Sequence, residues 1–208
     1  MSQLPFKIKS IKELAKFQLK EKGSLFVANA IQITDEKSAS SFVLKQKKAH
    51  FNANHNCFAY LVANGNLKYS DDGEPNGTAG IRILNAINHF KLKNICVVVT
   101  RYFGGTKLGI GSLGKTYYKT AFNCLENANT IEHTLFEEIV IEYDFQSSNQ
   151  VFRLAEKYQI KVTKNSYRNN PHLKGLLPIA NKLLLYEELN KNPSKSLKVD
   201  FKQIQKYL

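Results

Sequence analysis

The sequence predicts an α+β protein of two domains, one over residues 1–132 and the other over residues 133–208. Segments that alternate apolar and polar residues, as strands do, are interspersed with segments whose apolar residues recur every three or four positions, as in helices. The 208 residues, 43% of them hydrophobic, are enough for two small cores. The pattern stops and restarts around residues 130–136, which places the domain boundary there.

The first domain opens with an alternating strand over residues 25–33. Asp35 is the expected N-cap of a helix that continues to residue 48. A second strand over residues 56–62 turns tightly at residues 64–66, where the sequence is Asn-Gly-Asn, and returns as a short strand over residues 67–69. These elements predict a helix packed on an antiparallel pairing.

The first domain ends with two more helices around a buried strand. Thr78 is placed to cap a helix that runs to Phe90, because its hydroxyl can accept from the first-turn N–H groups. The apolar run over residues 95–100 predicts a buried strand. A glycine-rich segment follows, and then a helix over residues 111–127. Strands and helices together predict a two-layer α/β domain.

Six elements are predicted in the second domain. They are a strand at 136–143, a helix at 147–158, strands at 160–167 and 172–179, a helix at 181–190 and a strand at 195–204. The order β-α-β-β-α-β is that of a ferredoxin-like module. Pro178 argues locally against the third strand, because proline cannot donate a ladder hydrogen bond.

The charge of the chain favours a phosphate-rich partner. The net charge is +13, and nearly all of the positive charge is lysine spread along the chain. Solvated lysine faces would explain the same balance. Only four arginines are present, and arginine is the residue of bidentate base readout, so base-specific recognition is not indicated.

The cysteines and the absence of apolar runs predict a cytoplasmic protein. Cys57, Cys96 and Cys124 are odd in number and form no C-x-x-C pair, as expected in a reducing compartment. Cys96 and Cys124 fall in apolar stretches and are expected in the core. An alternative is a catalytic Cys57 paired with His55 or His50. No run is long enough to span a membrane, and the first nine residues hold no apolar signal region.

Two glycine-rich loops are the most informative stretches of the chain. Residues 70–80 read SDDGEPNGTAG and are acidic, whereas residues 100–111 read TRYFGGTKLGIG and are basic. With Gly114, they hold eight of the eleven glycines. Such clustering indicates tight turns or close approach of the backbone to another group. Loops of this kind are more typical of a working surface than of a plain connector.

The two loops resemble the paired signature of the YigZ/IMPACT family. The family patterns S-D-D-G-E-P-x-G-T-A-G and V-V-V-x-R-Y-[FY]-G-G-x-x-L-G-x-G-x-L match residues 70–80 and 97–113 at every fixed position. A shorter match lies upstream at Ala53, His55, Cys57 and Ala59. The strong matches lie within residues 53–125. The family pattern often has a second histidine at Asn56 and an arginine at Leu25, and this chain has neither.

The resemblance implies a fold and a role in translation. The first domain would be like domain two of small-subunit ribosomal protein five and the penultimate domain of elongation factor G. The second would be like the last domain of elongation factor G. A cytoplasmic, non-enzymatic, translation-linked regulatory protein that binds RNA or the ribosome is then expected. Eukaryotic relatives regulate translation by binding a partner of a starvation-response kinase and have an extra N-terminal domain, and that pathway is not carried over.

Residues 109–116 also satisfy two nucleotide-binding patterns, G-x-G-x-x-G and G-x-x-x-x-G-K-T. The context argues against both, because residues 102–108 separate the segment from the strand that should precede it directly. Relatives usually have a bulky residue at Gly114 and a small one at Thr116. A nucleotide- or metal-dependent hydrolase that uses both loops remains the alternative function. A third is a protein-interaction module with an acidic partner.

The candidate site combines both loops. The three carboxylates of the acidic loop have oxygen ligands for Mg²⁺ or Ca²⁺, but pairing with Arg101 or Arg82 is favoured over a metal, and no cofactor is assigned. Tyr102 and Phe103 are expected in the core, with base stacking as the alternative. The candidate phosphate contacts are Arg101, Gly104, Gly105, Lys107, Gly109, Gly111 and Lys115. The supporting residues are Asp71, Asp72, Glu74, Gly77, Thr78 and His55.

Overall fold

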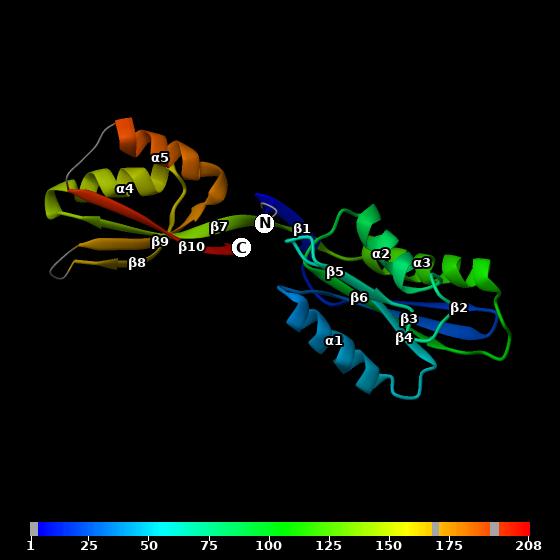
Figure 1. Ribbon diagram of the computed structural model, residues 1–208. Helices are drawn as coiled ribbons and strands as arrows, with labels where there is room; N and C mark the ends of the chain where they lie inside the picture. The colour runs from blue at the N-terminus through cyan, green and yellow to red at the C-terminus, as the bar shows by residue number, and fades with distance from the viewer. Residues whose placement is uncertain (1–3, 168–170, 192–195) are drawn as a thin grey trace. The chain divides into compact units, whose positions relative to one another are not determined.

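The computed structural model describes residues 4–167, 171–191 and 196–208. The chain forms two compact units (Figure 1). The first holds Ile8–Glu132, and the second holds His133–Leu208 together with Pro5–Lys7. The α+β class predicted from the sequence is confirmed, with sheets and helices in both units.

The first unit is built on a five-stranded antiparallel sheet of order β2-β3-β6-β4-β5. In that order the strands are β2 (Ala15–Glu21), β3 (Ser24–Gln32), β6 (Ile95–Tyr102), β4 (His55–Leu61) and β5 (Leu67–Ser70). Strand β6 is the centre of the sheet and is buried along nearly its whole length. Its last residues therefore deliver Arg101 and Tyr102 to one end of the sheet, beside the start of β4.

Helices cover both faces of this sheet (Figure 1). Helices α2 (Gly80–His89) and α3 (Ile110–Glu126) pack on one face, where the core includes Phe26, Ile83 and Tyr117. Helix α1 (Glu36–Ala49) packs its apolar side on the other face, adding a third layer to the two that the sequence predicted. Asp35 caps α1 as predicted and accepts from the Ser38 N–H at 2.7 Å.

The second unit follows the element order predicted for it. Its sheet has the antiparallel order β10-β7-β9-β8, with β1 (Lys7–Ile11) also beside β7. The elements are β7 (Thr130–Tyr143), α4 (Ser148–Lys157), β8 (Lys161–Ser166), β9 (His172–Pro178), α5 (Lys182–Lys191) and β10 (Leu197–Tyr207), with short 3-10 turns at Phe145–Ser147 and Ile179–Asn181. Both α-helices lie on one face of the sheet (Figure 1).

Pro178 fits the third of these strands because it is the last residue of β9, where the ladder ends. The predicted start of the last strand at residue 195 lies outside the described residues. Within the part of the chain that the structure describes, no helix has both the length and the apolar character needed to cross a membrane.

Candidate functional site

Asp71 holds the acidic loop to the start of α2. Its carboxylate accepts backbone hydrogen bonds from Gly77 at 2.9 Å and from Ala79 and Gly80 at 2.8 Å each. These N–H groups include the first of α2, which have no partner inside the helix. The cap predicted for Thr78 is therefore wrong, since its hydroxyl donates to the Pro75 carbonyl instead, at 2.6 Å.

Asp72 is bound to different neighbours. Its carboxylate accepts from Lys47 Nζ of α1 at 2.6 Å and from the Asn56 backbone N–H of β4 at 2.7 Å. Asp71 and Asp72 thus serve two separate structural contacts. Within residues 4–167, 171–191 and 196–208, no group of three or more His, Cys, Asp or Glu side chains is arranged to hold a metal ion.

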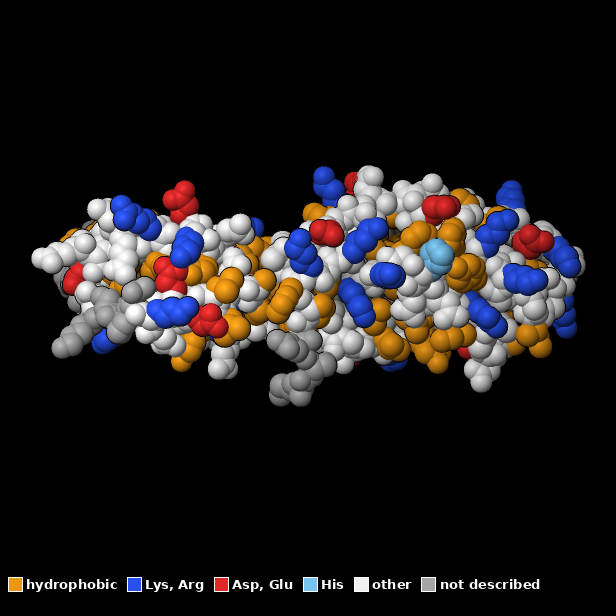
Figure 2. Space-filling view, turned by 90° about the horizontal axis from the view of Figure 1, so that it is seen from above, with side chains coloured by type: hydrophobic (Ala, Val, Ile, Leu, Met, Phe, Trp, Pro, Cys, Tyr) orange, Lys and Arg blue, Asp and Glu red, His pale blue; other side chains and the backbone are white. Residues whose placement is uncertain are grey.

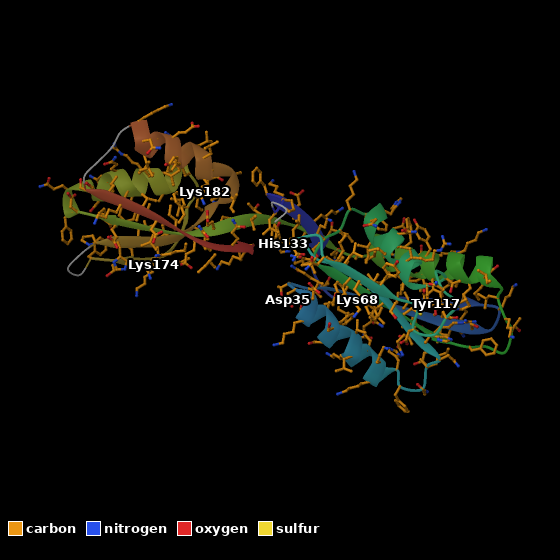
Figure 3. All side chains as sticks on the ribbon, in the orientation of Figure 1. Asp35, Lys68, Tyr117, His133, Lys174 and Lys182 are labelled. Carbon is orange, nitrogen blue, oxygen red and sulfur yellow. The ribbon has the colours of Figure 1, made fainter. Side chains whose placement is uncertain are left out.

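Glu74 is the acidic partner of Arg101, which confirms the predicted pairing of the two loops. Its Oε1 and Oε2 lie 2.8 and 3.1 Å from Arg101 Nη1, and the two side chains are 3% and 7% exposed. Tyr117 belongs to α3 (Figure 3), and its hydroxyl donates to Glu74 Oε1 at 2.7 Å. His55 Nε2 lies 3.8 Å from Oε2. Buried charges of this kind need such partners to avoid a large desolvation cost.

The aromatic rings fix the position of the Arg101 guanidinium. Its central carbon lies 5.4 Å from the centre of the Phe26 ring and 5.5 Å from that of Phe103. The Phe103 N–H donates to Asn54 Oδ1 at 2.8 Å, and the Asn54 N–H donates to the Arg101 carbonyl at 3.0 Å. The residues that leave β6 are therefore held in one conformation by the loop that precedes β4.

The structure does not support a catalytic Cys57. Burial raises the pKa of its thiol, which keeps the sulfur in the weakly nucleophilic protonated form. Its sulfur lies 2.9 Å from the Asp71 carbonyl oxygen, whereas His55 Nδ1 pairs with the Asp72 carbonyl and His50 with the Tyr102 hydroxyl. Neither histidine pairs with the thiol. The prediction that Cys96 and Cys124 belong to the core is confirmed.

Two of the loop glycines are required by close packing of the backbone. A Cβ on Gly104 would stand 1.9 Å from the Gly23 carbonyl carbon, and the Gly104 N–H already donates to Ser24 Oγ. A Cβ on Gly80 would stand 2.7 Å from the backbone of Ser70. Gly104 is therefore needed for packing against the β2–β3 turn, and its phosphate contact stays a prediction.

A pocket of about 410 Å³ opens beside the start of α3, and we call it the α3 pocket. Four of its lining residues are charged or titratable: His55, Glu74, Arg101 and Lys107. The others are the apolar residues Pro75, Phe103, Leu108, Ile110 and Leu113, and the glycines Gly73 and Gly109. The pocket therefore gathers Arg101, Lys107 and Gly109 of the predicted contacts with His55 and Glu74 of the predicted support.

The other predicted contacts lie elsewhere. Gly111 and Lys115 line a second pocket of about 450 Å³ between α2 and α3, with Arg82, Asn85, Gly114 and Tyr118. Gly105 lines neither of these two pockets. Figure 2 shows Lys and Arg side chains spread over the visible face of the first unit without a single dense cluster. The predicted set is thus divided between two places.

The nucleotide-binding patterns at residues 109–116 do not form a phosphate loop. The segment is helical from Ile110 onward, and the Thr116 hydroxyl donates to the Ser112 carbonyl one turn before it, at 2.8 Å. A phosphate loop needs these residues in an open turn whose N–H groups surround the phosphate. Only the first N–H groups of α3 keep that capacity.

Sequence reasoning missed the roles of Tyr117 and Asn54. Tyr117 lies in the helix predicted over residues 111–127, and its hydroxyl joins Glu74 to the core. The signal was its hydroxyl in an otherwise apolar helix stripe, since a buried tyrosine usually finds a hydrogen-bond partner. Burial raises the pKa of this hydroxyl, so it stays protonated and able to donate.

Comparison with known proteins points to one family. The Impact N-terminal domain model matches residues 22–125. IMPACT family member YvyE of Bacillus subtilis is 33% identical over 77% of this chain and 75% of its own. An IMPACT family member of Haemophilus influenzae is 34% identical over 76% of this chain and 78% of its own. A crystal structure described as a hypothetical protein has a TM-score of 0.68 at 26% identity and covers 94% of this chain and 97% of its own.

Proposed function

Because this chain belongs to the IMPACT family, we propose that it is a cytoplasmic, translation-linked regulatory protein that binds RNA or the ribosome. The contact surface is the segment from Arg101 to Gly111, together with the α3 pocket. The observation that carries the proposal is the position of Arg101, whose charge is held at the pocket wall by Glu74 and two aromatic rings.

The charges of the α3 pocket suit an anion. Glu74 is matched by Arg101, so Lys107 and the positive end of α3 have no counter-charge among the lining residues of the pocket. Phosphate is the anion that an arginine fork, a lysine and a helix start recognise together. The net charge of +13 strengthens attraction to a polyphosphate and adds no sequence preference.

The proposed role is binding rather than catalysis. Asp71 and Asp72 are occupied by backbone and lysine donors, and Glu74 by Arg101 and Tyr117. A general base or metal ligand needs a free carboxylate oxygen that faces its substrate. The acidic loop is therefore a support that holds the basic one in position.

The proposal is tested by fluorescence anisotropy of a labelled ribosomal RNA fragment at low and at physiological salt. We compare the unaltered chain with Lys107→Ala/Lys115→Ala. The control Lys37→Ala/Lys45→Ala removes the same charge from exposed positions of α1, on the opposite face of the sheet. Arg101 is left in place because its loss would strand Glu74.

The expected result is salt-sensitive binding that weakens in the first variant and much less in the control. Each lost phosphate contact lowers the slope of log affinity against log salt by about 0.7 for a single strand. Equal weakening in both variants would mean diffuse lysine charge. Absence of binding at low salt would refute the RNA proposal and direct the search to acidic protein partners.

A further inference from the structure

We propose that the α3 pocket holds one unpaired nucleotide, with its phosphate at the start of α3 and its base against Phe103. This inference deepens the proposed function and rests on it. The ligand of the pocket would be a phosphate joined to a flat ring. Its binding would be distinct from nonspecific attraction by the lysines spread over the surface.

The phosphate end of the pocket is the first turn of α3. The helix is 17 residues long, and its N-cap Gly109 provides no side-chain hydrogen bond. The first N–H groups of a helix have no partner inside it, and the helix dipole is positive there. Ile110 and Gly111 are exposed, so an anion can reach this end. Lys107 lines the same pocket and adds a full positive charge.

Arg101 provides a second and independent sign of a ligand. Its side chain is only 7% exposed and lines the pocket. Both carboxylate oxygens of Glu74 accept from Arg101 Nη1, and Arg101 Nε has no hydrogen-bond partner within the described residues. Buried donors are rarely left unpaired, because an unmade hydrogen bond costs about 1–3 kcal/mol. Nε itself is closed to solvent, so a bound phosphate oxygen would satisfy it only after the side chain shifts toward the pocket.

The exposed aromatic ring of Phe103 suits a flat apolar ligand. Phe103 is 44% exposed, although its backbone is fixed by Asn54 and one face of its ring meets Arg101. Ile110, which is 71% exposed, adds a further apolar side chain to the lining. An aromatic ring next to a cation is the usual platform for an unstacked base. The prediction that Phe103 belongs to the core is therefore wrong, and its exposed ring is available to a base.

The size of the pocket limits the occupant to one nucleotide. A volume of about 410 Å³ lies at the small end of the range for small-ligand sites. A paired base is not available for stacking, whereas an unpaired base in a loop or at a strand end can turn outward. A free mononucleotide has the same phosphate and ring, so the experiment must separate these two sources.

The test uses the full chain and three probes: a short single-stranded RNA, the same RNA as a duplex, and adenosine monophosphate. Amide chemical shifts of Ile110 and Gly111 report on the phosphate directly and need no variant. Anisotropy compares Phe103→Ala with Phe51→Ala. Phe51 is the matched control because it is 86% exposed and does not line the pocket.

The single strand is expected to shift both amides, and Phe103→Ala to weaken its binding about tenfold with Phe51→Ala unchanged. The monophosphate should shift the same amides more weakly, and duplex binding should not depend on Phe103. A monophosphate that binds as tightly as the strand would support the pocket and identify the free nucleotide as its ligand. If RNA bound Phe103→Ala as tightly as the unaltered chain and did not shift the amides of Ile110 and Gly111, this inference would be overturned while the proposed function stands. If the unaltered chain bound none of the RNA probes, the proposed function itself would be overturned.

Discussion

Replacing Glu74 by Gln should destabilise the first unit through Arg101. The substitution keeps the shape of the side chain and one acceptor oxygen for the Tyr117 hydroxyl. It removes the charge that faces a guanidinium of which only 7% is exposed, and it places an amide group against Nη1. The guanidinium would then be buried without a counter-charge.

The expected loss is about 3 kcal/mol of unfolding free energy, at the lower end of the 3–5 kcal/mol typical of a broken buried pair. The lower end applies because the Tyr117 hydrogen bond survives in the glutamine variant. A loss of this size is a large share of the roughly 5–15 kcal/mol that stabilises a domain. Removing the stranded guanidinium as well, in Glu74→Gln/Arg101→Met, should recover part of the loss.

The assay is urea unfolding followed by amide signals of Ile8–Glu132, since the two units need not unfold together. The control is Glu36→Gln, because Glu36 is exposed and accepts its hydrogen bonds from the neutral side chains of Asn66 and Tyr60. An unchanged midpoint in Glu74→Gln would refute the reasoning. So would a double variant less stable than the single one, since that would show that the guanidinium was not stranded.

Three further predictions follow from the same contacts. Tyr117→Phe should cost about 1–3 kcal/mol by removing a donor to a buried carboxylate, while Tyr118→Phe should cost little because its hydroxyl makes no such bond; urea unfolding compares them. Gly80→Ala should lower the melting temperature because its Cβ would stand 2.7 Å from the backbone of β5, whereas Gly111→Ala meets open space and should add up to about 1 kcal/mol, as calorimetry would show. Burial raises the pKa of the Cys57 thiol, so its alkylation near pH 8 should be slow until urea unfolds the protein. The pKa in the folded state lies above the unfolded value of about 8.5, so the free energy of unfolding should fall as the pH rises past that value.

Much of the fold could be predicted because its elements carry local signals. The strands at the centre of the first sheet are apolar, and the helices have clear apolar stripes. Strand β2 alternates the apolar Ala15, Phe17 and Leu19 with polar residues, so its strand pattern was present although no element was predicted there. Strand β1 is only five residues long, too short for its alternation to stand out. The early start of β7 was missed because its first residues are mostly polar.

The site was predictable only in part because its contacts are not local. That a carboxylate of the acidic loop would pair with Arg101 followed from charge, but the choice of Glu74 depended on the fold. Asp71 caps α2 from eight and nine residues upstream, a distance at which no local capping pattern applies. Lys107 and Lys115 were grouped by sequence, whereas the start of α3 between them directs each to a different pocket.

The most direct test of the account is ultraviolet cross-linking of a single-stranded RNA to the full chain, with the linked residues mapped by mass spectrometry. The account predicts a principal cross-link at Phe103, the exposed ring of the α3 pocket, and its loss when Phe103 is replaced by Ala. Cross-links that fall mainly in the second unit, or that persist unchanged in Phe103→Ala, would contradict the assignment of this pocket as the RNA site.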